Sequence, residues 1–414
     1  MYKLQITTDR EIPFYRCGEE IIFHLTAWQD GKLLNGGSAV WQLYPGDTRR
    51  RASGTVVWDK ENPARIRCRP ERPGICFLQV GALRLNGAEL PWDGALPVCA
   101  AAAEPDAIRS EAVAPADFDA FWRHKIAEIS PGAVSRTPRP ECSTPELSAS
   151  TLTVKLPDHG CVDGILSVPV RGGRYPAIIG IPGAGPGNTT GGILYDLEVP
   201  HIRLMMNVHR FPTARNAGEQ TLRYERYNAA LPEKIYSLSH ADDRERYHFA
   251  SVWAAISRAV DFTAALPEFD GEHFFAAGNS QGGGTALAVA ALNHHITALA
   301  SGEPAFAGHG FWRESRRDCW PFLHENRGSG SDAAAPYFDL LFFAERVKIP
   351  SLLGAGFLDT TCPAEGIYAA FARLRGPRRM VPMIHSGHTT CSPFAAAVRD
   401  FFQKELHSHS NQEV

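Results

Sequence analysis

Gly278-Asn279-Ser280-Gln281-Gly282 is the segment that decides how this chain folds. It follows the apolar run Phe274-Phe275-Ala276-Ala277 and precedes a small-residue apolar stretch, 285–292. A Gly-x-Ser-x-Gly motif between a buried strand and a helix is typical of a tight, strained turn that presents a nucleophilic serine. The bare motif also occurs by chance, and a serine that only caps a helix is the alternative. The strand–turn–helix setting favours Ser280 as a nucleophile.

The sequence around this motif alternates between strands and helices. Buried parallel strands appear as continuous apolar runs, and such runs lie at 177–181, 204–208, 296–300, 351–355 and 380–384. Two edge-type strands are expected at 152–156 and 164–168, and a helix at 247–265. This alternation predicts a doubly wound, mostly parallel sheet.

A serine hydroxyl is a weak nucleophile, so Ser280 needs a base within hydrogen-bonding reach and a carboxylate that orients the base. In sheets that carry this motif, the chain order is serine, acid, histidine, with the acid and the histidine each after a late strand. Asp359 follows the strand at 351–355, and His388 follows the strand at 380–384. We therefore predict Asp359 as the orienting acid and His388 as the base.

Other residues compete for these two roles. Asp332 and Asp339 are less favoured as the acid because neither follows a strand closely. His385 ends the strand at 380–384 itself, and we expect it to contribute mainly to stability, as a buried polar group does. His388 follows Gly387, which lets the chain turn toward the serine.

A tetrahedral intermediate on Ser280 would need two N–H donors for its oxyanion. One is predicted to be the backbone N–H of Gln281, the residue after the nucleophile. The other should come from the loop 182–187, after the strand at 177–181. Pro182 has no N–H to donate, so Ala184 is the first choice and Gly185 the second. A glycine-rich loop without a chemical role is the alternative.

Two more features lie near the predicted site. His209 and Arg210 follow the strand at 204–208, and such a pair is more often a structural hydrogen-bond anchor than a substrate contact. The segment 302–335 is expected to form a lid over the acyl pocket, and it carries the aromatic residues Phe311, Trp312, Trp320 and Phe322.

The first hundred residues have a different pattern. Short β-branched and aromatic runs alternate with turn pairs such as Asp30-Gly31 and Pro73-Gly74, which predicts a β-sandwich of immunoglobulin size over 1–100. Its role is open between a spacer or assembly surface and sugar binding. An Ala/Pro/Glu-rich linker is expected at 101–116 and a catalytic domain at 117–408. The latter opens on a helix whose aromatic residues, among them Phe118 and Trp122, are expected to pack in the core.

The composition excludes several classes of function. The net charge is −3 without long runs of one sign, so nucleic acid and anionic membranes are not expected as partners. The apolar runs are shorter than the roughly 18 residues of a membrane span. Nine scattered cysteines without a Cys-x-x-Cys pair favour free thiols, and with no signal peptide in the numbered chain they predict a cytoplasmic location. The histidines lack metal-ligand spacing, so we expect neither metal nor cofactor.

At these residues the chain resembles the acetyl xylan esterase and cephalosporin-C deacetylase family of α/β-hydrolases, over about 115–405. The resemblance lies in several segments: Pro115-Ala116-Asp117-Phe118-Asp119-Ala120-Phe121-Trp122, Arg258-Ala259-Val260-Asp261-Phe262, Leu266-Pro267-Glu268-Phe269-Asp270, Gly278-Asn279-Ser280-Gln281-Gly282-Gly283, Tyr337-Phe338-Asp339, Asp359-Thr360-Thr361-Cys362-Pro363 and Gly387-His388. Two segments depart from it. Pro182-Gly183-Ala184 stands where the family has His-Gly-Tyr, and Arg210-Phe211-Pro212 stands where it has Arg-Gly-Gln.

The resemblance implies an α/β-hydrolase fold behind the β-sandwich and a serine esterase that removes acetyl groups from carbohydrates such as xylo-oligosaccharides, through an acyl-enzyme on Ser280. It also implies a homo-oligomer, because the family forms hexamers. Two alternatives stay open at this point: a peptidase or thioesterase that uses the same three residues, and a non-catalytic scaffold that binds carbohydrate.

Overall fold

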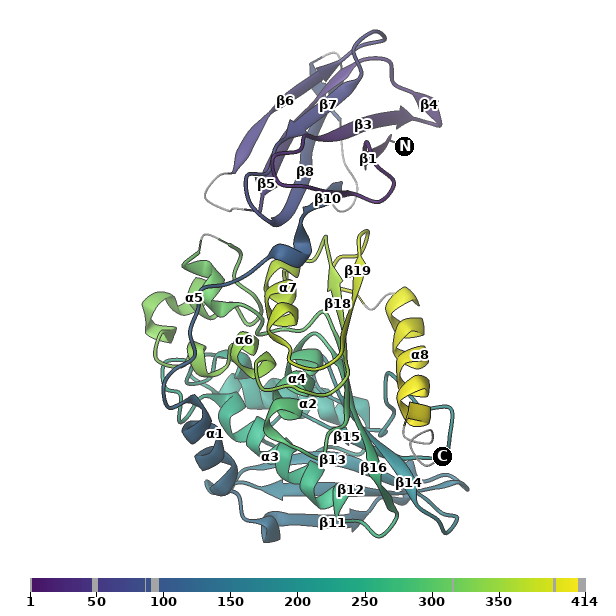
Figure 1. The fold of residues 1–414 in the computed structure, drawn as a ribbon, viewed down its shortest axis with the longest axis vertical. Coiled ribbons are helices and arrows are strands. Elements are labelled where there is room, and N and C mark those ends of the chain that lie inside the picture. Colours follow the sequence, from purple (N-terminus) through teal and green to yellow (C-terminus); the bar gives the residue numbers. More distant parts are fainter. Residues whose placement is uncertain are drawn as a thin grey trace.

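The computed structural model describes residues 2–46, 51–85, 87–90, 97–314, 316–389 and 392–408. A β-rich amino-terminal part is stacked on a larger part in which helices flank one long sheet (Figure 1). Within the described ranges, we find no helix that combines the length and the apolar character required to cross a membrane.

The amino-terminal part consists of two sheets. The first contains β1 (Tyr2–Thr8), β3 (Ile21–Gln29), β4 (Lys32–Leu33) and β7 (Ala64–Cys68), and the second contains β2 (Phe14–Tyr15), β5 (Gly37–Pro45), β6 (Ala52–Trp58), β8 (Gly74–Leu85), β9 (Ala88–Glu89) and β10 (Val98–Ala103). Alternate residues of β3 point inward, and Phe23 packs in one cluster with Leu43 and Leu78 of the other sheet. The predicted β-sandwich is therefore confirmed.

The end of the sandwich differs from the prediction. Strand β10 pairs with β8 up to Ala103, so the first three residues of the predicted linker 101–116 belong to the sheet. These residues are alanines with no exposed surface, and their small side chains fit the contact between the two parts of the chain. An alanine-rich stretch suggests a linker in the sequence, but here the alanines are buried. The domain division itself stays a prediction.

The larger part is built on a nine-stranded sheet. In spatial order its strands are β11 (Val134–Pro138), β12 (Leu147–Lys155), β13 (Cys161–Pro169), β15 (Ile202–Met206), β14 (Tyr175–Ile181), β16 (Phe269–Asn279), β17 (Ala298–Gly302), β18 (Ser351–Gly356) and β19 (Arg378–Met383). The strands from β15 to β19 are parallel, and the others pair antiparallel. This confirms the doubly wound, mostly parallel sheet. Strands β11 and β19 form the two edges of the sheet. The strands β12 and β13 are therefore interior, and the expectation that they are edge strands is wrong.

Helices cover both faces of this sheet. They are α1 (Phe118–Ala127), α2 (Ala217–Ala230), α3 (His248–Ala264), α4 (Gln281–Leu292), α5 (Leu323–Arg327), α6 (Leu340–Ala344), α7 (Ala364–Arg373) and α8 (Ser392–Ser408). Short 3-10 turns lie at Pro105–Ala107, Pro131–Ala133, Pro140–Cys142, Tyr236–Leu238, His309–Trp312, Gly328–Ser331 and Ala335–Tyr337. Phe274 and Ala276 of β16 pack with α1, α3 and α4, whereas Phe275 and Ala277 pack with α8 on the other face (Figure 1). The alternation along β16 thus builds two cores.

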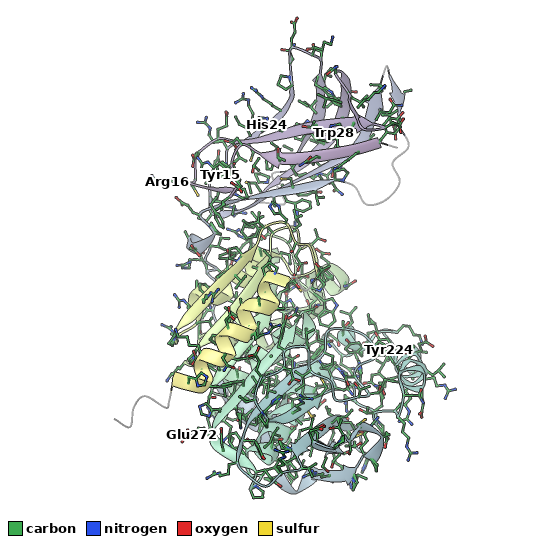
Figure 2. The ribbon with its side chains drawn as sticks, turned by 90° about the vertical axis from the view of Figure 1, so that its right-hand side faces the viewer. Tyr15, Arg16, His24, Trp28, Tyr224 and Glu272 are labelled. Atoms are coloured by element: carbon green, nitrogen blue, oxygen red, sulfur yellow. The ribbon has the colours of Figure 1, made fainter. Side chains whose placement is uncertain are left out.

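The sandwich lies at the carboxyl end of the parallel strands. Glu272, near the start of β16, is at the end of the molecule far from the sandwich, whereas Tyr15 and Arg16 are on the side of the sandwich nearer the sheet (Figure 2). The ring of Phe14 meets the ring of Phe357, directly after β18, at 5.7 Å between centroids. The sandwich therefore contacts the edge of the sheet where open α/β sheets bind their ligands.

The helix that opens the larger part gives a test of the core. Trp122 is buried, stacks on Trp253 at 5.5 Å and donates its Nε1–H to the carbonyl of Tyr337. Trp122→Ala should lower the free energy of unfolding by about 3–5 kcal/mol, because it leaves a cavity in the core. The control Arg123→Ala, on the exposed side of α1, should stay within about 0.5 kcal/mol. Urea unfolding measures the stability of both variants. Equal unfolding midpoints for Trp122→Ala and Arg123→Ala would contradict the packing described for Trp122.

Candidate active site

The turn at Ser280 is made of backbone in close contact. Ser280 lies between the end of β16 and the start of α4, with a positive φ of 56°. A Cβ atom on Gly278 would lie 2.4 Å from the carbonyl carbon of Gly282, and one on Gly282 would lie 2.1 Å from the carbonyl oxygen of Ile181 in β14. Side chains larger than hydrogen therefore do not fit at either position, and the glycines of the motif have a steric cause.

Three of the predicted residues form one hydrogen-bonded chain. His388 Nε2 lies 2.8 Å from Ser280 Oγ, and His388 Nδ1 lies 2.8 Å from Asp359 Oδ2. The other oxygen of Asp359 accepts the backbone N–H groups of Thr361 and Cys362, at 2.8 and 2.9 Å. The buried carboxylate is thus held on both sides, and it fixes the orientation of the imidazole.

The charges around the three hydrogen-bonded residues favour the protonated form of the His388 imidazole. Burial opposes the charged form of His388, but the hydrogen bond to Asp359 and the charges of Asp359 and Glu303 outweigh it and raise the pKa of His388. A histidine in this setting can accept a proton from a hydroxyl group that is in contact with its Nε2 atom.

The competing residues lie elsewhere. His385 is exposed, because β19 ends at Met383 and the histidine falls in the following turn. The expectation that it is a buried polar group is therefore wrong. Asp339 caps α6 and accepts the N–H groups of Gly308 and Leu341, and Asp332 pairs with Arg313.

The loop after β14 lies beside Ser280. A Cβ atom on Gly183 would come within 4.0 Å of the Cβ atom of Ser280. The side-chain amide of Gln281 donates to the carbonyls of Pro182 and Gly183, at 3.4 and 3.3 Å, and so ties this loop to α4. Gln281 is also the first residue of α4, where a backbone N–H has no partner within the helix. Ala184 is exposed in this loop, and its role as the second donor stays a prediction.

His209 anchors the same loop. Its side chain is 1% exposed, and its Nε2 atom lies 2.7 Å from the carbonyl oxygen of Gly185. Burial lowers the pKa of His209 to about 4, so the ring is neutral and donates this hydrogen bond. Arg210 forms an ion pair with Asp158. Both residues therefore have structural contacts, as the favoured interpretation expected.

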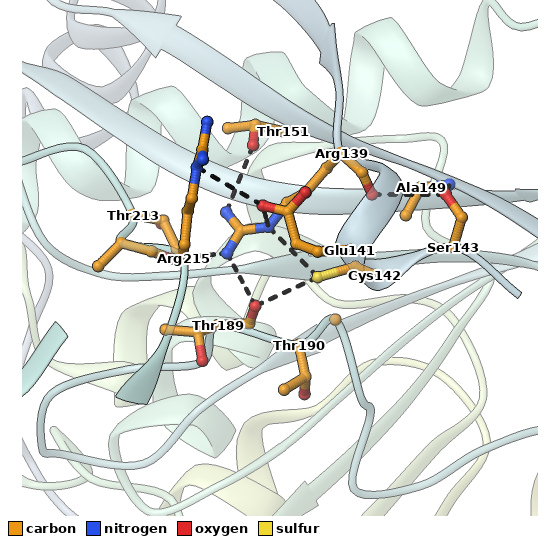
Figure 3. A network of polar contacts seen from close by, with 12 residues as sticks. Arg139, Glu141, Cys142, Ser143, Ala149, Thr151, Thr189, Thr190, Thr213 and Arg215 are labelled. Carbon is orange, nitrogen blue, oxygen red and sulfur yellow. Dashed lines mark hydrogen bonds and ion pairs between the residues drawn. The ribbon is translucent and has the colours of Figure 1, made fainter. Parts of the chain in front are cut away.

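A second anchor holds the continuation of this loop (Figure 3). Arg139 is buried and donates to the carbonyls of Thr189 and Ala214, at 2.9 and 2.6 Å. Asn207, after β15, accepts the N–H of Asn188 at 2.7 Å. These contacts join segments that are far apart in the sequence, so no local motif could have revealed them.

Two buried groups beside the chain of hydrogen bonds were not predicted. Glu303 directly follows β17, and Cys362 precedes α7 with its thiol in contact with Ser280. Burial raises the pKa of the Cys362 thiol. The signal for Glu303 was present, because it follows an apolar strand at the same edge of the sheet as Asp359.

Comparison with known proteins identifies the family. The acetyl xylan esterase (AXE1) family model matches residues 103–406. The chain belongs to the acetyl xylan esterase family. This confirms the resemblance found in the sequence, and it indicates a carboxylic ester hydrolase.

Individual relatives agree with this assignment. The acetyl esterase Axe7A of Xylanibacter ruminicola is 26% identical over 302 residues, which are 70% of this chain and 66% of that protein, so the match spans less than two thirds of its length. Two solved structures share the fold. The acetyl xylan esterase from Paenibacillus sp. R4 has a TM-score of 0.60 at 19% identity and covers 72% of this chain and 98% of its own. Acetyl xylan esterase 1 from Thermoanaerobacterium sp. JW/SL YS485 has a TM-score of 0.59 at 18% identity, and the match covers 74% of this chain and 98% of that structure.

The expected lid is partly core in this member of the acetyl xylan esterase family. Phe311 is buried in the main hydrophobic cluster. Trp320 is half-buried and donates its backbone N–H to the carbonyl of Thr361, in the loop that follows Asp359. Phe322 is also half-buried, and the side chain of Trp312 lies outside the described residues.

Among the described residues, two groups of side chains have the donor types that bind metals: Asp359, Cys362 and His388 at the site itself, and a second group that is fully buried. The donor atoms of His309, Asp318 and Cys319 lie within 4.8 Å of one another. The carboxylate of Asp318 already accepts the backbone N–H groups of Cys319, His324 and Glu325. These contacts give Asp318 a structural role.

The glycines at the turn provide a matched pair of variants. Gly282→Ala would place a methyl group against the backbone of Ile181, so it should lower the free energy of unfolding by at least about 3 kcal/mol or prevent folding. Gly183→Ala should be tolerated, because its nearest contact would be the Asn279 carbonyl oxygen at an ordinary 3.8 Å. Thermal unfolding of both variants decides this. Equal stability would mean that the turn is not packed as described.

Proposed function

We propose that this protein is a serine esterase that removes acetyl groups from carbohydrates such as acetylated xylo-oligosaccharides, through an acyl-enzyme on Ser280. The observation that carries the proposal is the unbroken chain of hydrogen bonds from Ser280 through His388 to Asp359. A hydroxyl, an imidazole and a buried carboxylate in this order are the parts of a nucleophile activated by a general base.

In the proposed reaction, His388 Nε2 takes the proton of Ser280 as Oγ attacks the ester carbonyl carbon. The oxyanion that forms is stabilised by the N–H of Gln281 and by an N–H of the loop 182–187, that of Ala184 or Gly185. The imidazolium then gives its proton to the departing sugar oxygen, which leaves the acetyl group on Ser280. A water molecule activated by His388 releases acetate by the same steps in reverse order.

The substrate class is supported by the family and by the names of the relatives. A triad alone serves esters, thioesters and amides, but the family and Axe7A are described as esterases of acetyl groups. The intact hydrogen-bonded chain argues against a degenerate scaffold. Homo-oligomerisation, a cytoplasmic location and the absence of a cofactor remain predictions from the sequence.

Removal of the nucleophile or of the base tests the chemistry. Ser280→Ala and His388→Ala should each reduce kcat for a nitrophenyl acetate by up to about a millionfold, because the members of a triad act as a unit. His385→Ala is the matched control, three residues from the base, and should retain wild-type kcat and stability within about 0.5 kcal/mol because its side chain is exposed. Substantial turnover by Ser280→Ala would refute the assignment of the nucleophile.

The acyl preference tests the substrate class separately. Acetyl esters should exceed octanoyl esters in kcat/KM when both carry the same leaving group. Acetate release from a panel of acetylated glycans would then identify the sugar. The reverse order of chain lengths would indicate a different acyl pocket, while leaving the roles of Ser280 and His388 in place.

A further inference from the structure

A second carboxyl group lies beside the proposed catalytic chain. Glu303 is 2% exposed and directly follows β17, the strand between the one that leads to Ser280 and the one that leads to Asp359. Its backbone has a positive φ of 45° and is held by the N–H bond to the carbonyl of Gly354 in β18, at 2.9 Å. A left-handed conformation is unfavourable for a residue with a side chain, so the surrounding structure fixes this carboxyl group in place.

The surroundings of this carboxyl group are unusual. The backbone N–H of Thr389, the residue after His388, donates to the carbonyl of Gly387 at 2.9 Å, and it also favours the charged form of Glu303 and so lowers its pKa. Among the described residues, its Oε1 atom has no hydrogen-bond partner. Buried carboxylate oxygens without partners are costly, and they are retained where they have another role.

Three titratable groups in the described part of the chain interact with Glu303. They are Asp359 after β18, His388 after β19 and Cys362 before α7. Burial, followed by the charge of Asp359, raises the pKa of Glu303 from 4.5 to about 7, whereas a charged His388 lowers it. In return, Glu303 adds to the effects that raise the pKa of His388. A charge on either group therefore favours the opposite charge on the other.

We propose that Glu303 is a positioning residue of the active site, a second buried carboxyl group at the same sheet edge that offsets the positive charge on His388 when it accepts the proton of Ser280. The proposal rests on the proposed function. In this step the O–H bond of Ser280 breaks and an N–H bond forms at His388 Nε2, so one positive charge appears on the imidazole. Asp359 neutralises it through Nδ1, and Glu303 acts on it by charge, without accepting the proton.

A pH profile distinguishes this role of Glu303 from a purely structural one. Glu303→Gln preserves the shape of the side chain and its capacity to accept hydrogen bonds, so a purely structural role would leave the pH profile unchanged. Loss of the charge, in contrast, should make protonation of His388 less favourable. The midpoint of the acidic limb of the pH profile of kcat/KM should then move to lower pH. Below this midpoint, kcat/KM expressed as a fraction of its plateau value should rise by about threefold. The plateau kcat should fall, because the imidazolium formed in the reaction is less stabilised.

The control is another buried carboxyl group. Burial also raises the pKa of Asp163, which accepts the N–H of Thr213 and whose pKa is lowered by the charge of Arg139. Asp163→Asn should keep the wild-type pH profile. If Glu303→Gln and Asp163→Asn have the same profile as the wild type, the proposal is wrong.

A titration that does not require turnover separates this inference from the proposed function. In the Ser280→Ala background, the imidazole of His388 can be titrated by NMR with labelled histidine, with and without Glu303→Gln. A lower midpoint in the double variant supports the proposal even if the wild type proves inactive on every acetyl ester. An unchanged midpoint overturns it even if the wild type is an active esterase.

The thermal stability gives a third readout with a definite sign. The pKa of Glu303 is raised on folding from 4.5 to about 7. Between these two pH values, the carboxyl group of Glu303 therefore binds more protons in the folded state than in the unfolded state. The contribution of this group therefore destabilises the protein as pH rises through that window. The fall in Tm from pH 5 to pH 8 should be smaller in Glu303→Gln than in the wild type, and an equal fall counts against a buried ionisable Glu303.

Discussion

Backbone touches backbone around Ser280, and the site depends on that contact. The hydrogen atoms of Gly278 and Gly282 occupy spaces in which a Cβ atom would lie 2.4 or 2.1 Å from neighbouring main-chain atoms. This lets α4 begin directly above the ends of β14 and β16, with Ser280 at a positive φ between sheet and helix. Ser280 is therefore positioned by the packing of the helix against the ends of the two strands.

The same edge of the sheet collects the other groups. Parallel strands β17, β18 and β19 end side by side, and each is followed by a titratable residue: Glu303, Asp359 and His388. The loop after β14 completes the site from the other side, held by His209, Gln281 and Arg139. The sandwich adds a contact from Phe14 to Phe357, two residues before Asp359. The sandwich thereby reaches the loop that carries Asp359.

Much of this arrangement could be predicted from the sequence, because it is encoded locally. Ser280 has a motif, and Asp359 and His388 follow apolar strands in a fixed order. Strand β11 was missed because its residues are largely exposed and lack the apolar pattern of a buried strand. The sequence indicates the anchor His209, but not Arg139 and Asn207, because their partners lie far away along the chain. The order serine, acid, histidine requires a single acid, so it does not point to Glu303. His385 lies in the turn after the strand because β19 ends one residue earlier than the apolar pattern predicts.

The central claim is that Ser280 carries the acyl group during turnover. Acid quenching of the enzyme during steady-state hydrolysis of an activated acetyl ester, followed by peptide mass spectrometry, tests this directly. The account predicts one acetyl group, on the peptide that contains Ser280, absent from Ser280→Ala and lost on incubation without substrate. Acetate release by an enzyme whose trapped acetyl group lies on another residue would contradict it.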